Sequence, residues 1–105
     1  MDNRNEKLRE ALREVAAEFL AREAGPQSLI TVTAASLSAE GRRGTIFITV
    51  LPESAETAAL AFANRSRREF GEFFEKRVKR ASIPRVEFCL DRGQKSAQQL
   101  DDIAL

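Results

Sequence analysis

The chain has 105 residues, of which 43% are hydrophobic and 31% are charged, so it is long enough for one small domain with its own core. Its formal net charge of +1 argues neither for nor against nucleic acid as a partner, so the evidence must come from how the charges are distributed along the chain. Without histidine, the chain has no Ser-His-Asp or Cys-His catalytic arrangement and no Cys/His zinc site, and one cysteine forms no internal disulfide. We therefore expect a cytoplasmic binding protein rather than an enzyme, with no cofactor, no metal and no membrane-spanning segment.

The first predicted element is a helix from Arg4 to about Arg22. Apolar residues recur there at spacings of three, four and one, which places them on one face, while charged residues fill the other. Gly25-Pro26 ends this helix, because proline disfavours helical backbone before it and glycine permits a left-handed exit. The face predicted to pack inward consists of Leu8, Leu12, Val15, Phe19 and Leu20.

Two strands are predicted next. Leu29–Leu37 is rich in β-branched residues, and Thr45–Leu51 alternates apolar side chains on one face. The polar stretch Ser38–Gly44 between them is a short connection, so the strands should pair antiparallel. Phe47 is out of phase with the inward-facing set. It is expected on the open face of the sheet, either exposed for stacking on a base or a partner or covered by the C-terminal tail.

A broken helical region is predicted after Pro52. Ser54 is expected to cap a first helix that runs to about Asn64. The phenylalanine-rich stretch beyond it is expected to form a second helix that ends near Lys79. The least apolar part of this region, Asn64–Arg68, separates the two and predicts a kink or break.

A third strand is predicted to begin at Ile83-Pro84, with Cys89 facing away from the helices and without a redox role. Residues 1–95 are predicted to form one domain. Residues 96–105 are predicted to be a tail in which Ser96 caps a short helix. The side chains expected inward on the strand are Val86, Phe88 and Leu90, and those presented by the tail are Leu100, Ile103 and Leu105.

The predicted element order is α-β-β-α-α-β. A three-stranded sheet with helices on one face is a two-layer α+β domain, and this order is that of the type II KH fold. KH domains hold a nucleic-acid backbone with a Gly-x-x-Gly loop between two helices. Here Gly41-Arg42-Arg43-Gly44 falls between two strands instead, so its glycines are predicted to be turn residues. Arg42 and Arg43 remain candidate surface cations for RNA phosphates.

The strongest functional signal is the segment from Arg65 to Arg80. It holds seven cationic and three anionic residues, a local charge of +4. RNA backbones are polyanionic and arginine forks onto phosphate, so RNA contact is one interpretation. The other is a solvated helix face with pairs such as Glu72 with Lys76. We favour RNA contact at the predicted break and leave both interpretations open further along. The predicted RNA-binding residues are Arg65, Ser66, Arg67, Arg68, Lys76, Arg77, Lys79, Arg80, Arg42 and Arg43.

Three stretches of the chain resemble the bacterial ribosome-binding factor A family. The segment LITVTAASLSAEGRRGTIFITVL, residues 29–51, is similar to the family's first hairpin. EKRVKRASIPRVEFCLD, residues 75–91, is similar to its Arg-Leu-x-x-Arg-x-x-Pro-x-Leu-x-Phe-x-x-Asp segment. Leu100-Asp101-Asp102-Ile103 is similar to its closing Ile-Asp-x-Leu. The order and spacing of these stretches extend the resemblance along nearly the whole chain.

The resemblance implies a KH-like fold in which a short Ala-x-Gly, rather than Gly-x-x-Gly, marks the break between the helices. That triplet aligns with Ser66-Arg67-Arg68, where serine replaces alanine and arginine replaces glycine. A positive φ without glycine costs about 1 kcal/mol or more. The helix is therefore expected either to bend differently or to continue more smoothly.

The resemblance also implies a monomeric, non-catalytic ribosome assembly factor. Such a protein binds the free small (30S) ribosomal subunit and its 16S rRNA and assists late maturation of the precursor rRNA. Two alternatives stay open: a general KH-like single-stranded RNA-binding protein, and a protein-interaction module that uses the open face or an edge of the sheet. Neutralising the arginines at the break would separate the RNA-binding hypotheses from the last one.

Overall fold

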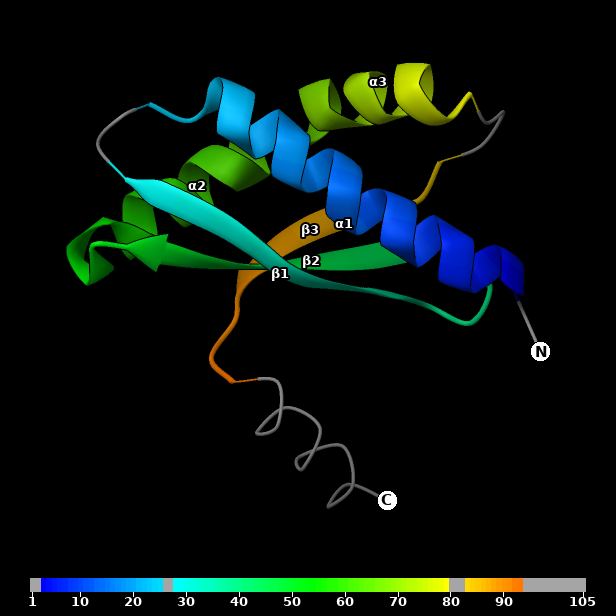
Figure 1. The fold of residues 1–105 in the computed structure, drawn as a ribbon, viewed down its shortest axis with the longest axis horizontal. Helices are drawn as coiled ribbons and strands as arrows, with labels where there is room; N and C mark the ends of the chain where they lie inside the picture. Colours follow the sequence, from blue (N-terminus) through cyan, green and yellow to red (C-terminus); the bar gives the residue numbers. More distant parts are fainter. Residues whose placement is uncertain (1–2, 26–27, 80–82, 94–105) are drawn as a thin grey trace.

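The computed structural model describes residues 3–25, 28–79 and 83–93 of the chain. The elements, in order, are α1 (Asn3–Glu23), β1 (Leu29–Leu37), β2 (Arg43–Leu51), the short 3-10 helix η1 (Glu53–Ala55), α2 (Glu56–Arg65), α3 (Arg67–Val78) and β3 (Arg85–Leu90), as Figure 1 shows. The predicted α+β class and the predicted order α-β-β-α-α-β are confirmed. In these ranges, no helix combines the length and the apolar character needed to cross a membrane.

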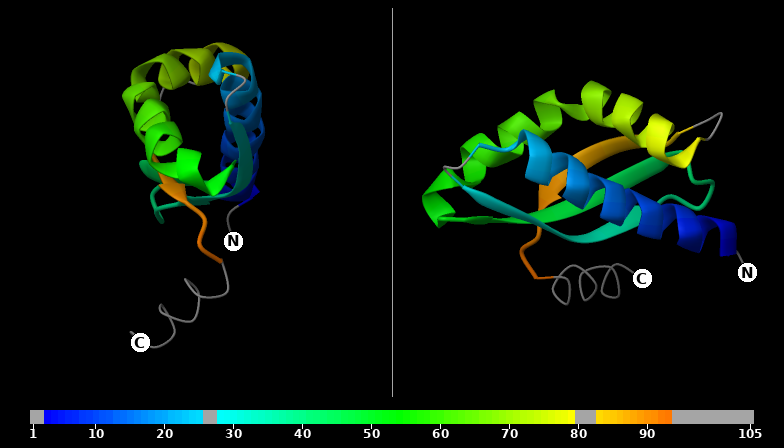
Figure 2. Two further views of the ribbon diagram at one scale, coloured as in Figure 1. Left: turned by 90° about the vertical axis from the view of Figure 1, so that its left-hand side faces the viewer. Right: turned by 45° about the horizontal axis from the view of Figure 1, so that its top comes forward.

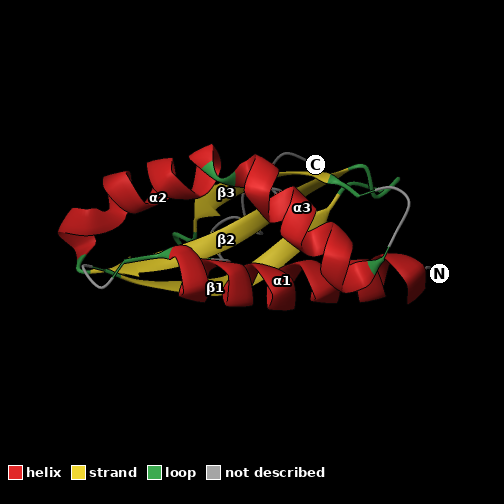
Figure 3. Cartoon of the chain, turned by 90° about the horizontal axis from the view of Figure 1, so that it is seen from above, coloured by secondary structure: helices red, strands yellow, loops and turns green. Residues whose placement is uncertain are grey.

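The sheet is mixed, with strand order β1-β2-β3. β1 and β2 pair antiparallel from Leu29 opposite Leu51 to Leu37 opposite Gly44, with an irregularity at Thr33. β3 pairs parallel with β2, which places Arg85 opposite Arg43 and Leu90 opposite Ile48. All three α-helices lie on the same face of this sheet (Figures 2 and 3). The predicted two-layer arrangement is therefore confirmed, and the other face of the sheet has no helix of the described chain against it.

The core lies between the helices and the inward face of the sheet. α1 packs on β1 and α3, and α2 packs on β3. Phe70 is the centre of an aromatic cluster, because its ring lies 5.5 Å from Phe19, 5.8 Å from Phe74 and 5.9 Å from Phe88. These rings join α1, α3 and β3, so the position of α3 over the sheet is fixed by apolar contacts along its inward face. The core also contains buried residues of α1 and of β2, which are Leu8, Leu12, Leu20, Ile46, Ile48 and Val50.

Two local predictions differ from the structure. β2 begins at Arg43 rather than Thr45, because Arg43 and Gly44 pair with the start of β3, a strand more than 40 residues away in sequence. Ser54 does not cap α2: it lies in the 3-10 helix that follows Pro52, and the N-cap residue Ala55 makes no side-chain capping hydrogen bond. The predicted short helix of the tail lies outside the described residues.

Candidate nucleic-acid interface

The break between α2 and α3 is centred on Ser66. Its backbone has φ −94° and ψ 10°, and its N–H is shared between the carbonyls of Phe62 and Ala63 at 3.1 Å each. The side chain is 7% exposed, and its hydroxyl donates to Phe62 O at 2.9 Å. Phe70 N then donates to Ser66 O at 2.8 Å, which starts the hydrogen-bonding pattern of α3. A serine hydroxyl bonded back to the preceding turn bends a helix, so the predicted break is confirmed and needs no positive φ.

Asn64 connects this break to the edge of the sheet. Its side-chain Nδ2 donates to Phe88 O at 3.1 Å, and its Oδ1 accepts from Phe88 N at 3.0 Å. β3 is an edge strand, so these two hydrogen bonds satisfy the outward-facing backbone groups of Phe88. One amide therefore holds the end of α2 against the middle of β3.

The arginines at the break are exposed. Arg67 Nε donates to Asn64 O at 3.0 Å, which satisfies a carbonyl at the end of α2. Arg65 and Arg68 make no side-chain hydrogen bond or ion pair within the described part of the chain. Ser66, which was predicted to bind RNA alongside them, is buried and its hydroxyl is engaged. The structure thus leaves the arginine side chains at the surface and gives Ser66 a role in shaping the break.

A groove of about 760 Å³ lies between α3 and the first residues of β2 and β3. Arg67 and Arg68 reach it from α3, Arg43 from β2 and Arg85 from β3. Sequence reasoning missed Arg85, although its place next to Pro84 and out of phase with Val86 could have indicated an outward side chain. Three carboxylates share the groove with these four guanidinium groups: Glu72, Glu75 and Glu87. The groove therefore presents both charge signs, with arginine in excess.

The Gly-x-x-Gly motif begins in the connection between β1 and β2, and its last two residues, Arg43 and Gly44, start β2. Ser38 Oγ accepts from the backbone N–H of Arg42 at 3.2 Å and of Arg43 at 3.1 Å. Gly41 has φ +73°, the left-handed region that glycine adopts readily, whereas Gly44 lies within β2. The prediction that both glycines are turn residues is therefore confirmed for Gly41 and wrong for Gly44, which pairs with Leu37 and Val86 within the sheet. Arg42 O also accepts from Arg85 N at 2.8 Å, so the turn is tied to the start of β3. Of the two arginines in the motif, Arg43 lines the groove.

The second half of the basic segment, residues 76–80, differs from the arginines at the break in the partners of its side chains. Arg77 pairs with Glu18 of α1, at 2.7 Å between Nη2 and Oε2 and at 2.9 Å between Nη1 and Oε1. Its guanidinium carbon also lies 4.5 Å from the centre of the Phe73 ring. Lys76 is exposed and forms no ion pair with Glu72 in the described chain. Lys79 ends α3 in the left-handed conformation, and Arg80 lies outside the described residues.

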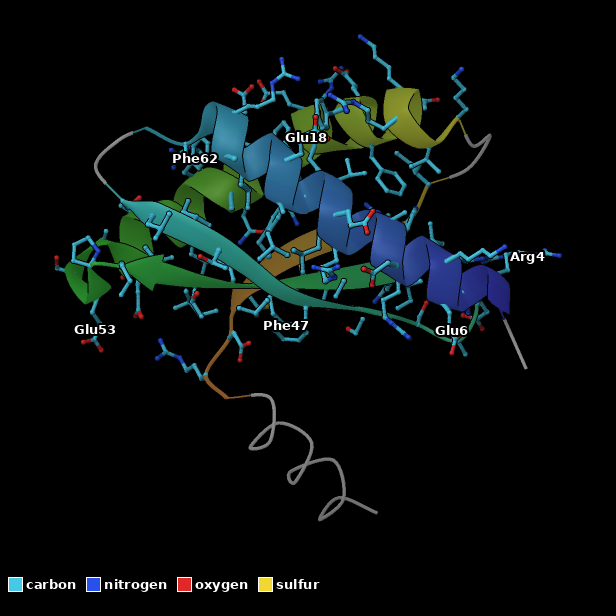
Figure 4. The ribbon with its side chains drawn as sticks, in the orientation of Figure 1. Arg4, Glu6, Glu18, Phe47, Glu53 and Phe62 are labelled. Carbon is cyan, nitrogen blue, oxygen red and sulfur yellow. The ribbon has the colours of Figure 1, made fainter. Side chains whose placement is uncertain are left out.

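Phe47 and Cys89 occupy the open face of the sheet. Figure 4 shows the Phe47 side chain directed away from the helices, as the out-of-phase pattern predicted. Cys89 is its partner in register on β3. Burial, followed by the neighbouring Glu87 carboxylate, raises the pKa of the Cys89 thiol, so the thiolate that reacts with oxidants is disfavoured. Both side chains are half-buried.

A mixed three-stranded sheet with a broken helix pair over one face, in this element order, defines a KH-like domain of type II topology. The family model of ribosome-binding factor A matches residues 4–104. The chain therefore belongs to the ribosome-binding factor A family. Comparison with curated protein sequences gives no match.

Solved structures agree with this assignment. The crystal structure of ribosome-binding factor A from Thermus thermophilus superposes with a TM-score of 0.74 at 28% identity, over 85% of this chain and 98% of that one. A homology model of the Thermus thermophilus factor, fitted into a cryo-EM map of its complex with the 30S subunit, gives 0.69 at 28% identity, over 77% and 88%. A Thermotoga maritima protein described as a candidate ribosome-binding factor A, solved by NMR, gives 0.67 at 22% identity, over 82% and 85%, and supports the fold alone.

Proposed function

We propose that this protein is a non-catalytic assembly factor that binds the free small (30S) ribosomal subunit in the cytoplasm. It contacts the 16S rRNA and assists late maturation of the precursor rRNA. Family membership supports ribosome binding, and the Thermus thermophilus relative fitted into a map of a 30S complex supports the small subunit as the partner. The residues that we propose for the interface line one groove of this chain.

The observation that carries the proposal is the convergence of arginines from three elements on one groove. Arg43, Arg67, Arg68 and Arg85 all line it, and none forms an ion pair with a described carboxylate. A guanidinium group binds phosphate through two parallel hydrogen bonds, and each phosphate that is neutralised releases condensed counterions. An exposed cation that forms no ion pair within the fold can bind an RNA phosphate without first losing a native ion pair.

The carboxylates of the groove fit the same partner. A carboxylate repels phosphate, but it accepts hydrogen bonds from the amino groups that unpaired bases expose. A groove with both charge signs therefore favours an RNA segment whose backbone lies on the arginines and whose bases reach the glutamates. Because the protein binds that arrangement better than others, it shifts the rRNA population toward it without any chemical step.

Co-sedimentation on sucrose gradients tests the proposal. The protein would be mixed with small subunits, large subunits and joined ribosomes at low and moderate salt. We expect it to sediment with free small subunits only, and less as salt rises. Equal sedimentation with every RNA-containing particle would instead support a general RNA-binding protein. No sedimentation at low salt, where phosphate contacts are strongest, would refute both and leave a protein-interaction module.

A further inference from the structure

The open face of the sheet carries one aromatic side chain among polar and charged ones in the described strands. Phe47, in the middle of β2, is half-buried, and Figure 4 shows its side chain directed away from the helices. Side chains alternate between the two faces along a strand, so every second residue of β2 and of β3 shares the face of Phe47. Threonines and charged residues around the ring make this face unlike the apolar surfaces that bind protein partners. The residues around Phe47 on these two strands are Arg43, Thr45, Thr49, Arg85, Glu87 and Cys89.

Two arginines lie side by side where β2 and β3 begin. Arg43 and Arg85 are partners in the parallel register, on strands about 4.8 Å apart, and both are exposed. Neither forms an ion pair within the described ranges of the chain. Glu87 follows Arg85 on the same face, but its Oε2 accepts from Cys89 Sγ at 3.5 Å, on the side away from Arg85. Two neighbouring cations without a carboxylate partner attract an anion, and a phosphate accepts hydrogen bonds from both.

The groove beside α3 continues onto the open face. Its walls include Val86, which packs against the core on the helix side of the sheet, and Thr45 and Glu87, which lie on the open side. β3 is the edge strand, so the groove extends around this edge. Phe47 follows Thr45 by two residues, about 7 Å along β2, and follows Arg43 by four, about 13 Å. A ligand that leaves the groove around the edge therefore meets the Phe47 ring next.

Single-stranded RNA carries the chemical groups that this surface fits. Its phosphates bind cations, its unpaired bases stack on aromatic rings, and its 2′-hydroxyls exchange hydrogen bonds with hydroxyl side chains such as that of Thr45. Base-paired RNA does not fit the ring, because its bases are already stacked on one another. An apolar protein segment fits less well, because it would remove Thr45, Thr49 and Glu87 from water without giving them hydrogen-bond partners.

We propose that an unpaired base of the RNA in the groove stacks on Phe47, while a neighbouring phosphate of the same strand binds Arg43 and Arg85. This inference rests on the proposed function, because the RNA is the one that the arginines of the groove bind. It extends the interface from the helix side of the sheet to the open side. Since every base has a flat π-face, the contact accepts any base and requires only that the base is unpaired. The protein therefore binds an open state of this RNA segment better than a paired one.

Affinity for the small subunit separates stacking from simple apolar contact. Filter binding would compare the wild type with Phe47→Leu, which keeps an apolar side chain but cannot stack, and with Phe47→Trp, which can. We expect Phe47→Leu to bind about tenfold more weakly and Phe47→Trp to stay within about twofold of the wild type. Leu51→Ala is the control, because it removes a 64% exposed apolar side chain from the same strand and face. It should bind as the wild type does.

The salt dependence of binding gives a second signature. Phe47→Leu should weaken binding by the same factor at every salt concentration, whereas Arg43→Gln/Arg85→Gln should lower the slope of log K against log salt by about 1 to 1.5. Urea denaturation would verify that the variants are folded. Wild-type binding with an unchanged Phe47→Leu would overturn this inference and leave the proposed function intact, whereas no wild-type binding would refute both. Equal losses in Phe47→Leu and Leu51→Ala would indicate an apolar contact with protein and also overturn it.

Zero-length crosslinking identifies the stacked partner directly. The complex of the wild-type protein with small subunits would be irradiated with short-wavelength ultraviolet light, digested with nuclease and protease, and analysed by mass spectrometry. We expect a nucleotide adduct on Phe47 or on Cys89, its partner in register. Nucleotide adducts elsewhere in the chain but on neither of these residues would overturn the proposal.

Discussion

The N-terminal end of α3 and its C-terminal end carry similar basic residues in different situations. Arg67 and Arg68 extend over a groove without a carboxylate partner, whereas Arg77 is held by Glu18 of α1 and by the face of Phe73. A basic residue already paired inside the fold must lose that pair before it can bind phosphate, and an unpaired one need not. The charge of a segment is therefore a poor guide to its RNA-binding part. Whether a given basic residue is available to bind phosphate depends on the partners that it has within the fold.

The largest expected effect is the loss of affinity for the small subunit when the arginines at the break are replaced. The variant Arg65→Gln/Arg67→Gln/Arg68→Gln should bind the small subunit about a hundredfold more weakly at moderate salt, with a salt dependence of log K lower by about 2 to 3. Its unfolding free energy should change by less than about 1 kcal/mol, because all three side chains are exposed. Filter binding at several salt concentrations measures the affinity.

A matched control removes the same charge at another place. Arg4→Gln/Lys7→Gln/Arg9→Gln neutralises three exposed cations near the start of α1, none of which lines the groove, although Asn5 in the same part of the helix donates to Ala39 O of the connection between β1 and β2. We expect it to weaken binding far less than the variant at the break. If both variants lose affinity equally, the protein responds to net charge and the groove has no special role.

Asn64 should contribute most to stability among the polar residues of this region. Asn64→Ala removes both hydrogen bonds to Phe88 and leaves two backbone groups of the edge strand unpaired. We expect a loss of about 2 kcal/mol in unfolding free energy, measured by urea denaturation. Thr57→Ala, an exposed position of the same helix, serves as the control. A loss under about 0.5 kcal/mol would mean that water replaces the amide at β3 without cost.

The sequence predicted local elements well because their signals are local. The strand Leu29–Leu37 was placed with its correct bounds, and the polar stretch around Ser66 correctly indicated a break. The start of β2 and the place of Arg85 were missed, because both depend on the pairing of β2 with β3. Hydrophobic alternation does not encode which distant strand supplies a partner, or in which direction it runs.

The candidate site was predictable only in part for the same reason. The basic segment is visible in the sequence, but nothing local distinguishes Arg77 from Arg68. The distinction comes from Glu18, which lies 59 residues away and reaches Arg77 only because α1 packs on α3. Similarly, Ser66 was grouped with its arginine neighbours, although its hydroxyl bonds to the preceding turn. A tertiary contact separates Arg77 from Arg68, whereas the role of Ser66 comes from a hydrogen bond to the residue four positions earlier.

Arg77 should matter for stability and not for RNA. Arg77→Gln removes a half-exposed ion pair and a cation–π contact, which together stabilise the α1–α3 packing by about 1 kcal/mol. A double-mutant cycle with Glu18→Gln should recover a coupling of roughly half that value by thermal or urea unfolding. Affinity for the small subunit should stay within about twofold of the wild type. A tenfold loss of affinity would place Arg77 in the interface and dissolve the contrast between the two ends of α3.

The smallest expected effects are changes in the free energy of unfolding when glycine replaces a residue at either end of α3. Arg68 is helical and lies at the position that aligns with the glycine of Ala-x-Gly, while Lys79 alone among the described non-glycine residues has a positive φ, 58°. Arg68→Gly should therefore destabilise the fold by about 0.8 kcal/mol, relative to Arg68→Ala. Lys79→Gly should stabilise it by about 0.5 kcal/mol relative to Lys79→Ala, because relief of the left-handed strain exceeds the added freedom of the unfolded chain. Urea titrations of the four variants give both differences. Stabilisation by Arg68→Gly would show instead that the break holds strain that a glycine relieves, and that the serine-based bend at Ser66 is a compromise rather than a substitute for the family's glycine.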